Sequence, residues 1–153
     1  MAALLAMSFD LAVGVPDSHL QALIAELETA MPVHVAPRED AAVAVACGLT
    51  LAGRIPLLYM KNAGLFTCGD ALVSLATDIG VAVTMLVGWA GTGADMLPHH
   101  VVSGERTVGL LEALGVAWRD TTDLGEDGVA WVQDCRERRQ HTAILVRPGG
   151  SHG

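Results

Sequence analysis

The feature that most constrains the fold is the strict alternation of short apolar runs with segments of helical periodicity. The apolar runs have the length and composition of buried strands, and they cover residues 9–15, 33–36, 55–60, 81–89, 116–119 and 142–146. Helices are expected between and after them, over 17–30, 40–51, 65–76, 104–115 and 128–139. This order is typical of βαβ units. The sequence therefore predicts a three-layer α/β/α sandwich with a mainly parallel six-stranded sheet.

Chain length and composition favour one domain that needs a partner. The 153 residues contain no internal repeat or linker, so we expect a single domain over 1–153 with a disordered tail from about 148. Apolar residues make up 52% and charged residues 17%, which is more apolar than the roughly 45–50% and about 25% of ordinary domains. The uncharged run 79–94 is shorter than the roughly 20 residues of a membrane span. The apolar excess therefore indicates a subunit interface rather than a membrane.

Charge and cysteine usage exclude several classes of protein. A net charge of −8 without an extended basic run argues against nucleic acid as a partner. The three cysteines form no Cys-x-x-Cys pair, which suits reduced thiols. The first ten residues have no basic start and too short an apolar stretch for a signal peptide. We therefore expect a cytoplasmic location.

Polar residues follow four of the predicted strands, where each strand ends. They are Asp17, Glu39, Asn62 and His100. The carboxyl ends of parallel strands share one rim, where open α/β sheets bind ligands. Each residue also has a purely structural interpretation. Asp17 and Ser18 are good helix caps, Asn62 suits a turn, and Glu39 is either a helix-start acid or a buried acid used in chemistry.

The segment after the fourth strand is predicted to be a glycine-rich loop that carries two adjacent histidines, His99 and His100. Its glycines do not form the G-x-G-x-x-G pattern of a dinucleotide site. At most one of two neighbouring histidines can point into a given site, and the spacing of metal ligands is absent. The loop therefore predicts no metal site, and one histidine either lines a pocket or lies on the surface.

Four segments together resemble the pyrimidine-binding domain of thiamine-diphosphate decarboxylases, and in particular the sulfopyruvate and phosphonopyruvate decarboxylase group. They are GVPDSHL (14–20), PREDAAVAVACGLTLAG (37–53), IPLLYMKNAGL (55–65) and LVGWAGTGADMLPHHVVSGERT (86–107). The chain departs from the family pattern at Arg38, where Asn is usual. Where the family usually has Gln-Asn-Ser-Gly-Leu, this chain has Lys61-Asn62-Ala63-Gly64-Leu65. Where the family usually has Gln-His, this chain has His99-His100.

The resemblance implies an α subunit of a split enzyme. Such enzymes hold the diphosphate and Mg²⁺ with a Gly-Asp-Gly segment that this chain lacks. A β subunit would then carry the diphosphate-binding domain and Mg²⁺, in an α2β2 or larger assembly. The implied reaction is a thiamine-diphosphate-dependent lyase reaction that converts a 3-substituted pyruvate, phosphonopyruvate or sulfopyruvate, to the aldehyde and CO₂.

The resemblance also implies roles for residues. The carboxyl group of Glu39 would contact the aminopyrimidine ring and relay a proton. His100 would be the second catalytic residue and would handle either protons or the anionic group of the substrate. The other cofactor-binding residues would be Pro37, Asn62 and Gly64. The substrate and its second anionic group would be bound by residues among Asp17, Ser18, His19, Lys61 and His99.

Two other functions remain open. The chain could be a non-catalytic binding or regulatory subunit with the fold of the pyrimidine domain. Half of an acetolactate-type ligase is disfavoured, because the chain lacks the middle domain of those enzymes. Thiamine-diphosphate-dependent release of CO₂ with a partner would separate catalysis from mere binding.

Overall fold

A single parallel sheet forms the centre of the protein. The computed structural model describes residues 1–149, and its sheet has six strands in the order β2-β1-β3-β4-β6-β5. Every neighbouring pair is parallel. The strands are β1 (Leu11–Gly14), β2 (Val33–Val35), β3 (Pro56–Lys61), β4 (Thr84–Gly88), β5 (Ala117–Asp120) and β6 (Thr142–Val146).

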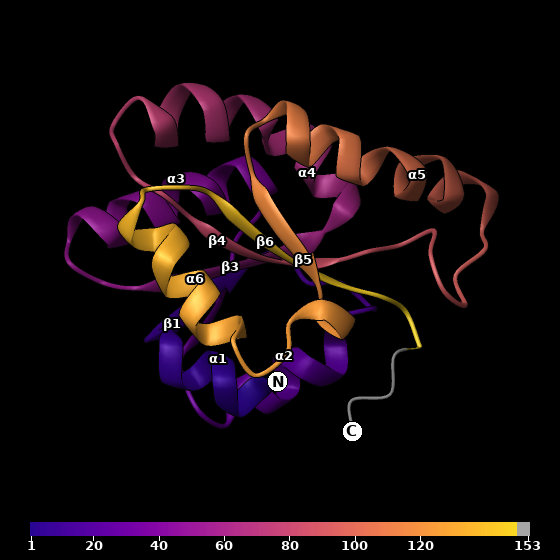
Figure 1. Ribbon diagram of the computed structural model, residues 1–153, viewed down its shortest axis with the longest axis horizontal. Coiled ribbons are helices and arrows are strands. Elements are labelled where there is room, and N and C mark those ends of the chain that lie inside the picture. Colours follow the sequence, from indigo (N-terminus) through magenta and orange to yellow (C-terminus); the bar gives the residue numbers. More distant parts are fainter. Residues whose placement is uncertain (150–153) are drawn as a thin grey trace.

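Helices cover both faces of this sheet (Figure 1). One layer contains α1 (Ala2–Ser8), α2 (Gln21–Glu28) and α6 (Gly128–Glu137). The other contains α3 (Glu39–Leu51), α4 (Asn62–Asp70), the π-helix η1 (Ala71–Thr77) and α5 (Pro98–Ala113). A short 3₁₀ turn, η2 (Thr121–Asp123), follows β5. The predicted three-layer α/β/α sandwich is therefore confirmed.

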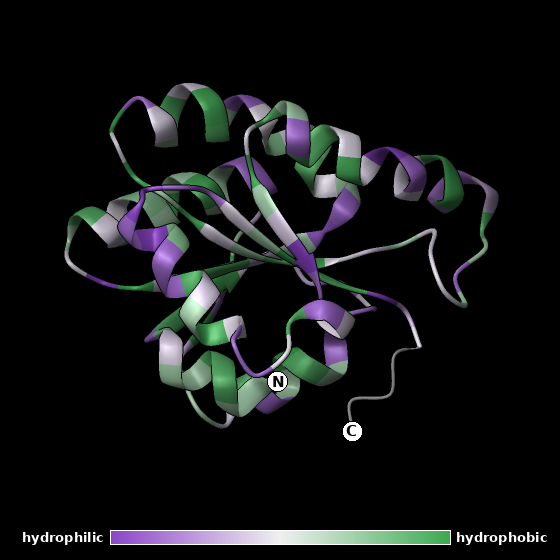
Figure 2. Ribbon diagram, viewed as in Figure 1, coloured by the Kyte–Doolittle hydropathy of each residue, from purple (hydrophilic) through white to green (hydrophobic). Residues whose placement is uncertain are grey.

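Two apolar cores lie on opposite faces of the central strands. On β3, Leu58 and Met60 face the α3–α4 layer, whereas Leu57 and Tyr59 face the α1–α2 layer. All four side chains are buried. A strand covered on both faces reads as a continuous apolar run, because neither set of alternate residues meets water. Figure 2 accordingly shows hydrophobic colour on the central strands and on the inner sides of both helical layers.

One helix was not predicted, and two others begin earlier than predicted. The unpredicted helix is α1; Leu5 on it and the following Phe9 are buried in the core against α2 and α6. The helix predicted over 65–76 begins at Asn62, so the interpretation of Asn62 as a turn residue is wrong. The loop predicted to contain His99 and His100 is also wrong in part, since α5 begins at Pro98 with proline in its first turn.

The other boundaries moved by at most three residues, as helix and strand ends usually do, except that α2 begins four residues later than predicted. One difference is qualitative, because the helix predicted over 65–76 passes from α4 into the π-helix η1. The hydroxyl of Thr77 donates to the carbonyl of Leu72, five residues earlier. Residues 150–153, and with them most of the predicted tail, lie outside the described residues.

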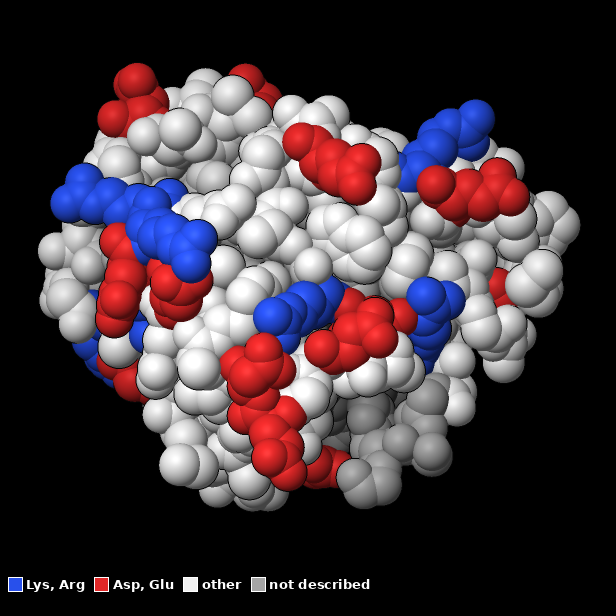
Figure 3. Space-filling view, in the orientation of Figure 1, with Lys and Arg blue, Asp and Glu red and all other residues white. Residues whose placement is uncertain are grey.

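The surface carries few charges and several exposed apolar side chains. On the face seen in Figure 3, acidic and basic groups lie in small clusters with uncharged surface between them. Exposed apolar residues include Val45, Phe66, Met96, Leu97 and Val102. Within residues 1–149, no helix has both the length and the apolar character needed to cross a membrane.

Candidate functional site

The ends of four neighbouring strands place the candidate residues along one rim of the sheet. Lys61, the last residue of β3, lies opposite Gly88, the last residue of β4. Asp17 follows β1, and Glu39 begins α3 after the edge strand β2. Because the sheet order is β2-β1-β3-β4, residues from distant parts of the chain meet at this rim, as the sequence predicts.

Glu39 lies against a glycine of the next helix. It is the first residue of α3, and Arg38 before it is extended. A Cβ atom on Gly64 would come within 2.4 Å of the Glu39 Cγ and 2.8 Å of its Oε1. The space that a side chain on residue 64 would fill is therefore occupied by the Glu39 side chain. Gly64 fixes where this carboxyl group can lie.

The surroundings of Glu39 leave its carboxyl group available. The nearest cation in sequence, Arg38, pairs with Asp40 instead, through Nε and Nη2 at 3.0 and 2.9 Å. Beneath Glu39 lies Cys68, whose thiol pKa is raised to about 12, first by burial and then by the nearby Glu39 carboxylate. Glu39 is half-buried. It is thus an acid at the rim whose oxygens are not tied to the preceding arginine.

A second carboxylate is seated against a second glycine. A Cβ on Gly88 would lie 2.0 Å from Oδ2 of Asp17, so only glycine at the end of β4 leaves room for this group. Asp17 is buried, and its Oδ2 has no hydrogen-bond partner within residues 1–149. Its other oxygen lies 3.3 Å from Nδ1 of His19. Buried polar atoms without partners are rare, so Oδ2 of Asp17 is an atom that a group from outside the chain can contact.

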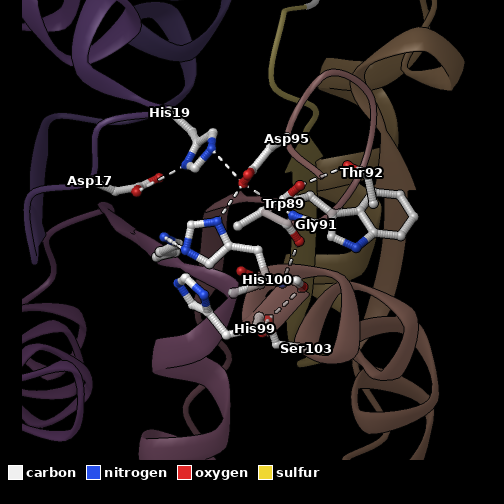
Figure 4. A network of polar contacts seen from close by, with 12 residues as sticks. Asp17, His19, Trp89, Gly91, Thr92, Asp95, His99, His100 and Ser103 are labelled. Atoms are coloured by element: carbon white, nitrogen blue, oxygen red, sulfur yellow. Dashed lines mark hydrogen bonds and ion pairs between the residues drawn. The ribbon is translucent and has the colours of Figure 1, made fainter. Parts of the chain in front are cut away.

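A chain of polar contacts continues from His19 across the rim (Figure 4). Nε2 of His19 lies 3.0 Å from Oδ2 of Asp95, and Nδ1 of His100 lies 2.7 Å from the same oxygen. The opposite ring nitrogen of His100, Nε2, is 2.8 Å from Nζ of Lys61. His19 and His100 therefore meet at Asp95, and Lys61 joins the network through His100.

Asp95 is held as a carboxylate by these neighbours. The pKa of Asp95 is well below the usual range, and the largest cause is the hydrogen bond from His100. The backbone N–H of Gly91, 3.2 Å away, lowers the pKa further. Partial burial opposes them. Gly91 itself packs against the backbone of His100, because a Cβ there would lie 1.9 Å from the His100 carbonyl oxygen. The loop and the first turn of α5 thus form one unit.

Asn62 lies inside the protein rather than on the open rim. Its side chain is fully buried and donates to the carbonyl of Ala90 at 3.1 Å and to the hydroxyl of Thr107 at 2.9 Å. Its Oδ1 has no partner within the described residues. Asn62 therefore ties the start of α4 to the loop after β4 and to α5.

The remaining predicted residues lie at the periphery. Pro37 is exposed before α3, and His99 is exposed with its ring 4.3 Å from that of His100. Ser18 and Asp17 line one end of a cleft of about 470 Å³ between α2 and the edge strand, which Val35 and Tyr59 also line. No group of three potential metal ligands occurs within residues 1–149.

The residue that sequence reasoning missed is Asp95. It lies in a loop without periodicity, and its partner His19 is far away in the sequence. The one local signal was its spacing of five residues from His100, because an acid just before a helix can reach back to the first turn. Its central place in the network became visible only from the fold.

Comparisons with known proteins bear on the family and the fold, and no protein-family model matches the chain. It is 32% identical over 113 residues to sulfopyruvate decarboxylase subunit alpha of Methanothermobacter thermautotrophicus, a match that covers 72% of this chain and 68% of that one. It is 26% identical over 117 residues to sulfopyruvate decarboxylase of Methanosarcina acetivorans, covering 76% of this chain and 30% of that one.

The solved structures agree at the level of fold. A thiamine diphosphate-dependent 4-hydroxybenzoylformate decarboxylase of Rhodococcus jostii superposes with a TM-score of 0.69 at 14% identity, over 96% of this chain and 29% of that one. The fold is thus one found as a part of thiamine diphosphate-dependent enzymes. At the level of sequence the chain belongs to the family of sulfopyruvate decarboxylase alpha subunits.

Proposed function

We propose that this chain is the α subunit of a thiamine-diphosphate-dependent decarboxylase whose active site is completed by a β subunit. The substrate is a 3-substituted pyruvate with a second anionic group, sulfopyruvate or phosphonopyruvate, which is converted to the aldehyde and CO₂. The observation that carries the proposal is the half-buried Glu39 carboxyl group, held against Gly64 at the end of β2.

The residues of this rim fit one half of a cofactor site. When bound, thiamine diphosphate supplies the electron sink that makes loss of CO₂ from a 2-oxo acid possible. Glu39 would bind the aminopyrimidine ring of the cofactor and hold the proton at one ring nitrogen. Gly64 keeps the carboxyl group in one place, and Pro37 precedes it at the same turn. Asn62 supports this arrangement from below, through Ala90 and Thr107.

We infer that the other half of the site comes from another chain. The sequence contains no Gly-Asp-Gly segment to hold the diphosphate and Mg²⁺. The aligned part makes up only 30% of the Methanosarcina protein, so that relative carries about twice as much additional chain. Exposed Met96, Leu97 and Val102 flank the polar network and suit contact with a partner. An α2β2 or larger assembly follows from this proposal.

The second anionic group of the substrate requires donors at the rim. The net charge of −8 makes a local cation necessary. Lys61 and His100 lie at the centre of the rim, with His19 and His99 on either side. The hydroxyl of Ser18 and the carboxylate of Asp17 border the neighbouring cleft. His100 would act on protons or on the anion through Nε2, which faces Lys61.

The test is reconstitution with a candidate β subunit that carries a Gly-Asp-Gly segment. Release of CO₂ from sulfopyruvate and phosphonopyruvate should require both chains, thiamine diphosphate and Mg²⁺. In the complex, Glu39→Gln should lower turnover by about 10²–10⁴-fold, the usual contribution of a positioned acid or base, because the amide cannot relay a proton. The control is Glu112→Gln, an exposed glutamate on α5.

Two outcomes would contradict the proposal. Near-normal turnover in Glu39→Gln, with Glu112→Gln also normal, would remove Glu39 from the chemistry. A stable complex that binds thiamine diphosphate but releases no CO₂ from either substrate would favour a binding or regulatory subunit instead. Unfolding by urea should be measured for each variant, so that loss of activity is separated from loss of fold.

A further inference from the structure

Asp95 is the point at which the polar network of the rim converges. A single oxygen, Oδ2, faces Nδ1 of His100 at 2.7 Å, Nε2 of His19 at 3.0 Å and the backbone N–H of Gly91 at 3.2 Å. The side chain is only 9% exposed. A carboxylate has no hydrogen to give, so Nδ1 of His100 and the N–H of Gly91 donate to it, while Nε2 of His19 lies within ion-pair distance.

This geometry fixes the protonation of His100. Nδ1 of its ring donates to Asp95, while Nε2 lies 2.8 Å from the ammonium nitrogen of Lys61. An ammonium group can only donate, so Nε2 must accept. His100 is therefore the neutral tautomer with hydrogen on Nδ1. The partner of one ring nitrogen determines the state of the other, as in other carboxylate–histidine pairs.

Lys61 is the only lysine in the chain. It is half-buried at the end of β3, and its ammonium group contacts the neutral ring of His100 rather than a carboxylate. One of its three hydrogens is used in this contact, and two remain. A cation whose partner is neutral keeps its full charge for an incoming anion.

The second histidine contacts both acids of the network. The two ring nitrogens of His19 face two carboxylates, Nδ1 that of Asp17 at 3.3 Å and Nε2 that of Asp95 at 3.0 Å. Asp17 and Asp95 thus have histidines as their side-chain partners. Lys61 is left as the cation of the network without a carboxylate partner among residues 1–149.

We propose that Asp95 is a positioning residue: by holding His100 in the Nδ1–H tautomer, it makes Nε2 orient the ammonium group of Lys61 toward the anionic substituent of the substrate. Asp95 itself does not touch the substrate. This inference rests on the proposed function for the identity of the anion, a sulfonate or phosphonate. The tautomer and the Lys61 contact are properties of the chain alone.

The first test reads the tautomer directly, without partner or substrate. In ¹⁵N spectra of the full chain labelled in histidine and lysine, His100, assigned with His100→Gln, should carry hydrogen on Nδ1 only. The single lysine side chain gives one resonance. Asp95→Asn should give a mixture of tautomers at His100 and shift the Lys61 resonance, because an amide can donate as well as accept. Asp95→Glu should keep the Nδ1–H state, and Asp123→Asn, at an exposed aspartate, should change neither.

The second test uses the reconstituted complex and a double-mutant cycle. Loss of a charge-assisted hydrogen bond corresponds to a change in binding of about tenfold or more. Lys61→Met and Asp95→Asn should each raise KM for the anionic substrate by about that factor, with a smaller change in kcat. If Asp95 acts through Lys61, the double variant should be no worse than Lys61→Met alone.

Three results would overturn the inference. Unchanged His100 and Lys61 resonances in Asp95→Asn would show that Asp95 does not set the tautomer. Additive effects of the two substitutions on KM would show that Asp95 does not act through Lys61. A wild-type complex without turnover would refute the proposed function and with it the role of the substrate anion, whereas the spectra would still decide the tautomer.

Discussion

Replacement of Gly64 by alanine should lower activity by about 10²-fold while leaving the fold at least as stable. Gly64 lies in the first turn of α4, and a Cβ atom there would come within 2.4 Å of the Glu39 Cγ. Such an approach is impossible for real atoms, so the flexible end of Glu39 must move. The added methyl group therefore displaces the carboxyl group without touching its chemistry.

The size of both effects follows from this geometry. Carbon atoms in ordinary contact are 3.4–4 Å apart, so Glu39 must retreat from a distance of 2.4 Å. The shift is about 1 Å, a misplacement that can lower a rate by about 10²-fold. The helix itself should gain, because alanine is favoured over glycine in a helix by about 0.5–1 kcal/mol. Loss of activity with unchanged or greater stability is therefore the expected signature.

The assay measures release of CO₂ by the reconstituted complex together with urea unfolding of the isolated chain. The matched control is Gly109→Ala on α5, because nothing lies within 4 Å of a Cβ at this position. It should bring the same gain in stability with normal activity. Normal activity in Gly64→Ala would refute the placement of Glu39, and a large loss of stability would show that the helix, rather than the carboxyl group, had to move.

Two further predictions concern buried groups elsewhere. His141 is 7% exposed and accepts from the N–H of Val83, and burial lowers its pKa from 6.5. Because the unfolded chain binds this proton more readily, the free energy of unfolding should decrease as pH falls below about 6.5, and His141→Gln should flatten this part of the urea-unfolding profile. The three cysteines are buried, and burial raises the pKa of Cys47 and Cys68. A thiol reagent at pH 8 should therefore label the native chain slowly and all three cysteines after unfolding; rapid native labelling would contradict the packing.

The parts of the fold that sequence reasoning predicted are those in which burial alone determines the secondary structure. The runs that became β3 and β6 are apolar at nearly every position, because helices cover both faces of the sheet. Once the strands were placed, the rim followed, since residues such as Glu39 and Lys61 come at strand ends. The parallel order was implied by the helices between the strands.

The parts that could not be predicted depend on tertiary contacts. Asn62 and Gly64 read as a turn, yet they begin a helix because Asn62 finds partners on Ala90 and Thr107. The contact between Lys61 and His100 spans 39 residues, and no local pattern encodes it. Proline at position 98 was a usable signal that α5 begins there rather than near residue 104.

The single lysine also gives the rim one side-chain amine that can be modified selectively. Apart from the amino terminus, an amine-directed crosslinker has only Lys61 to attack in this chain. A product that joins a partner to the chain at any site except the amino terminus must therefore involve Lys61. The crosslinked peptide of the partner then identifies the segment that lies over the end of β3. The composition of the chain thus allows the missing half of the site to be mapped without any engineered label.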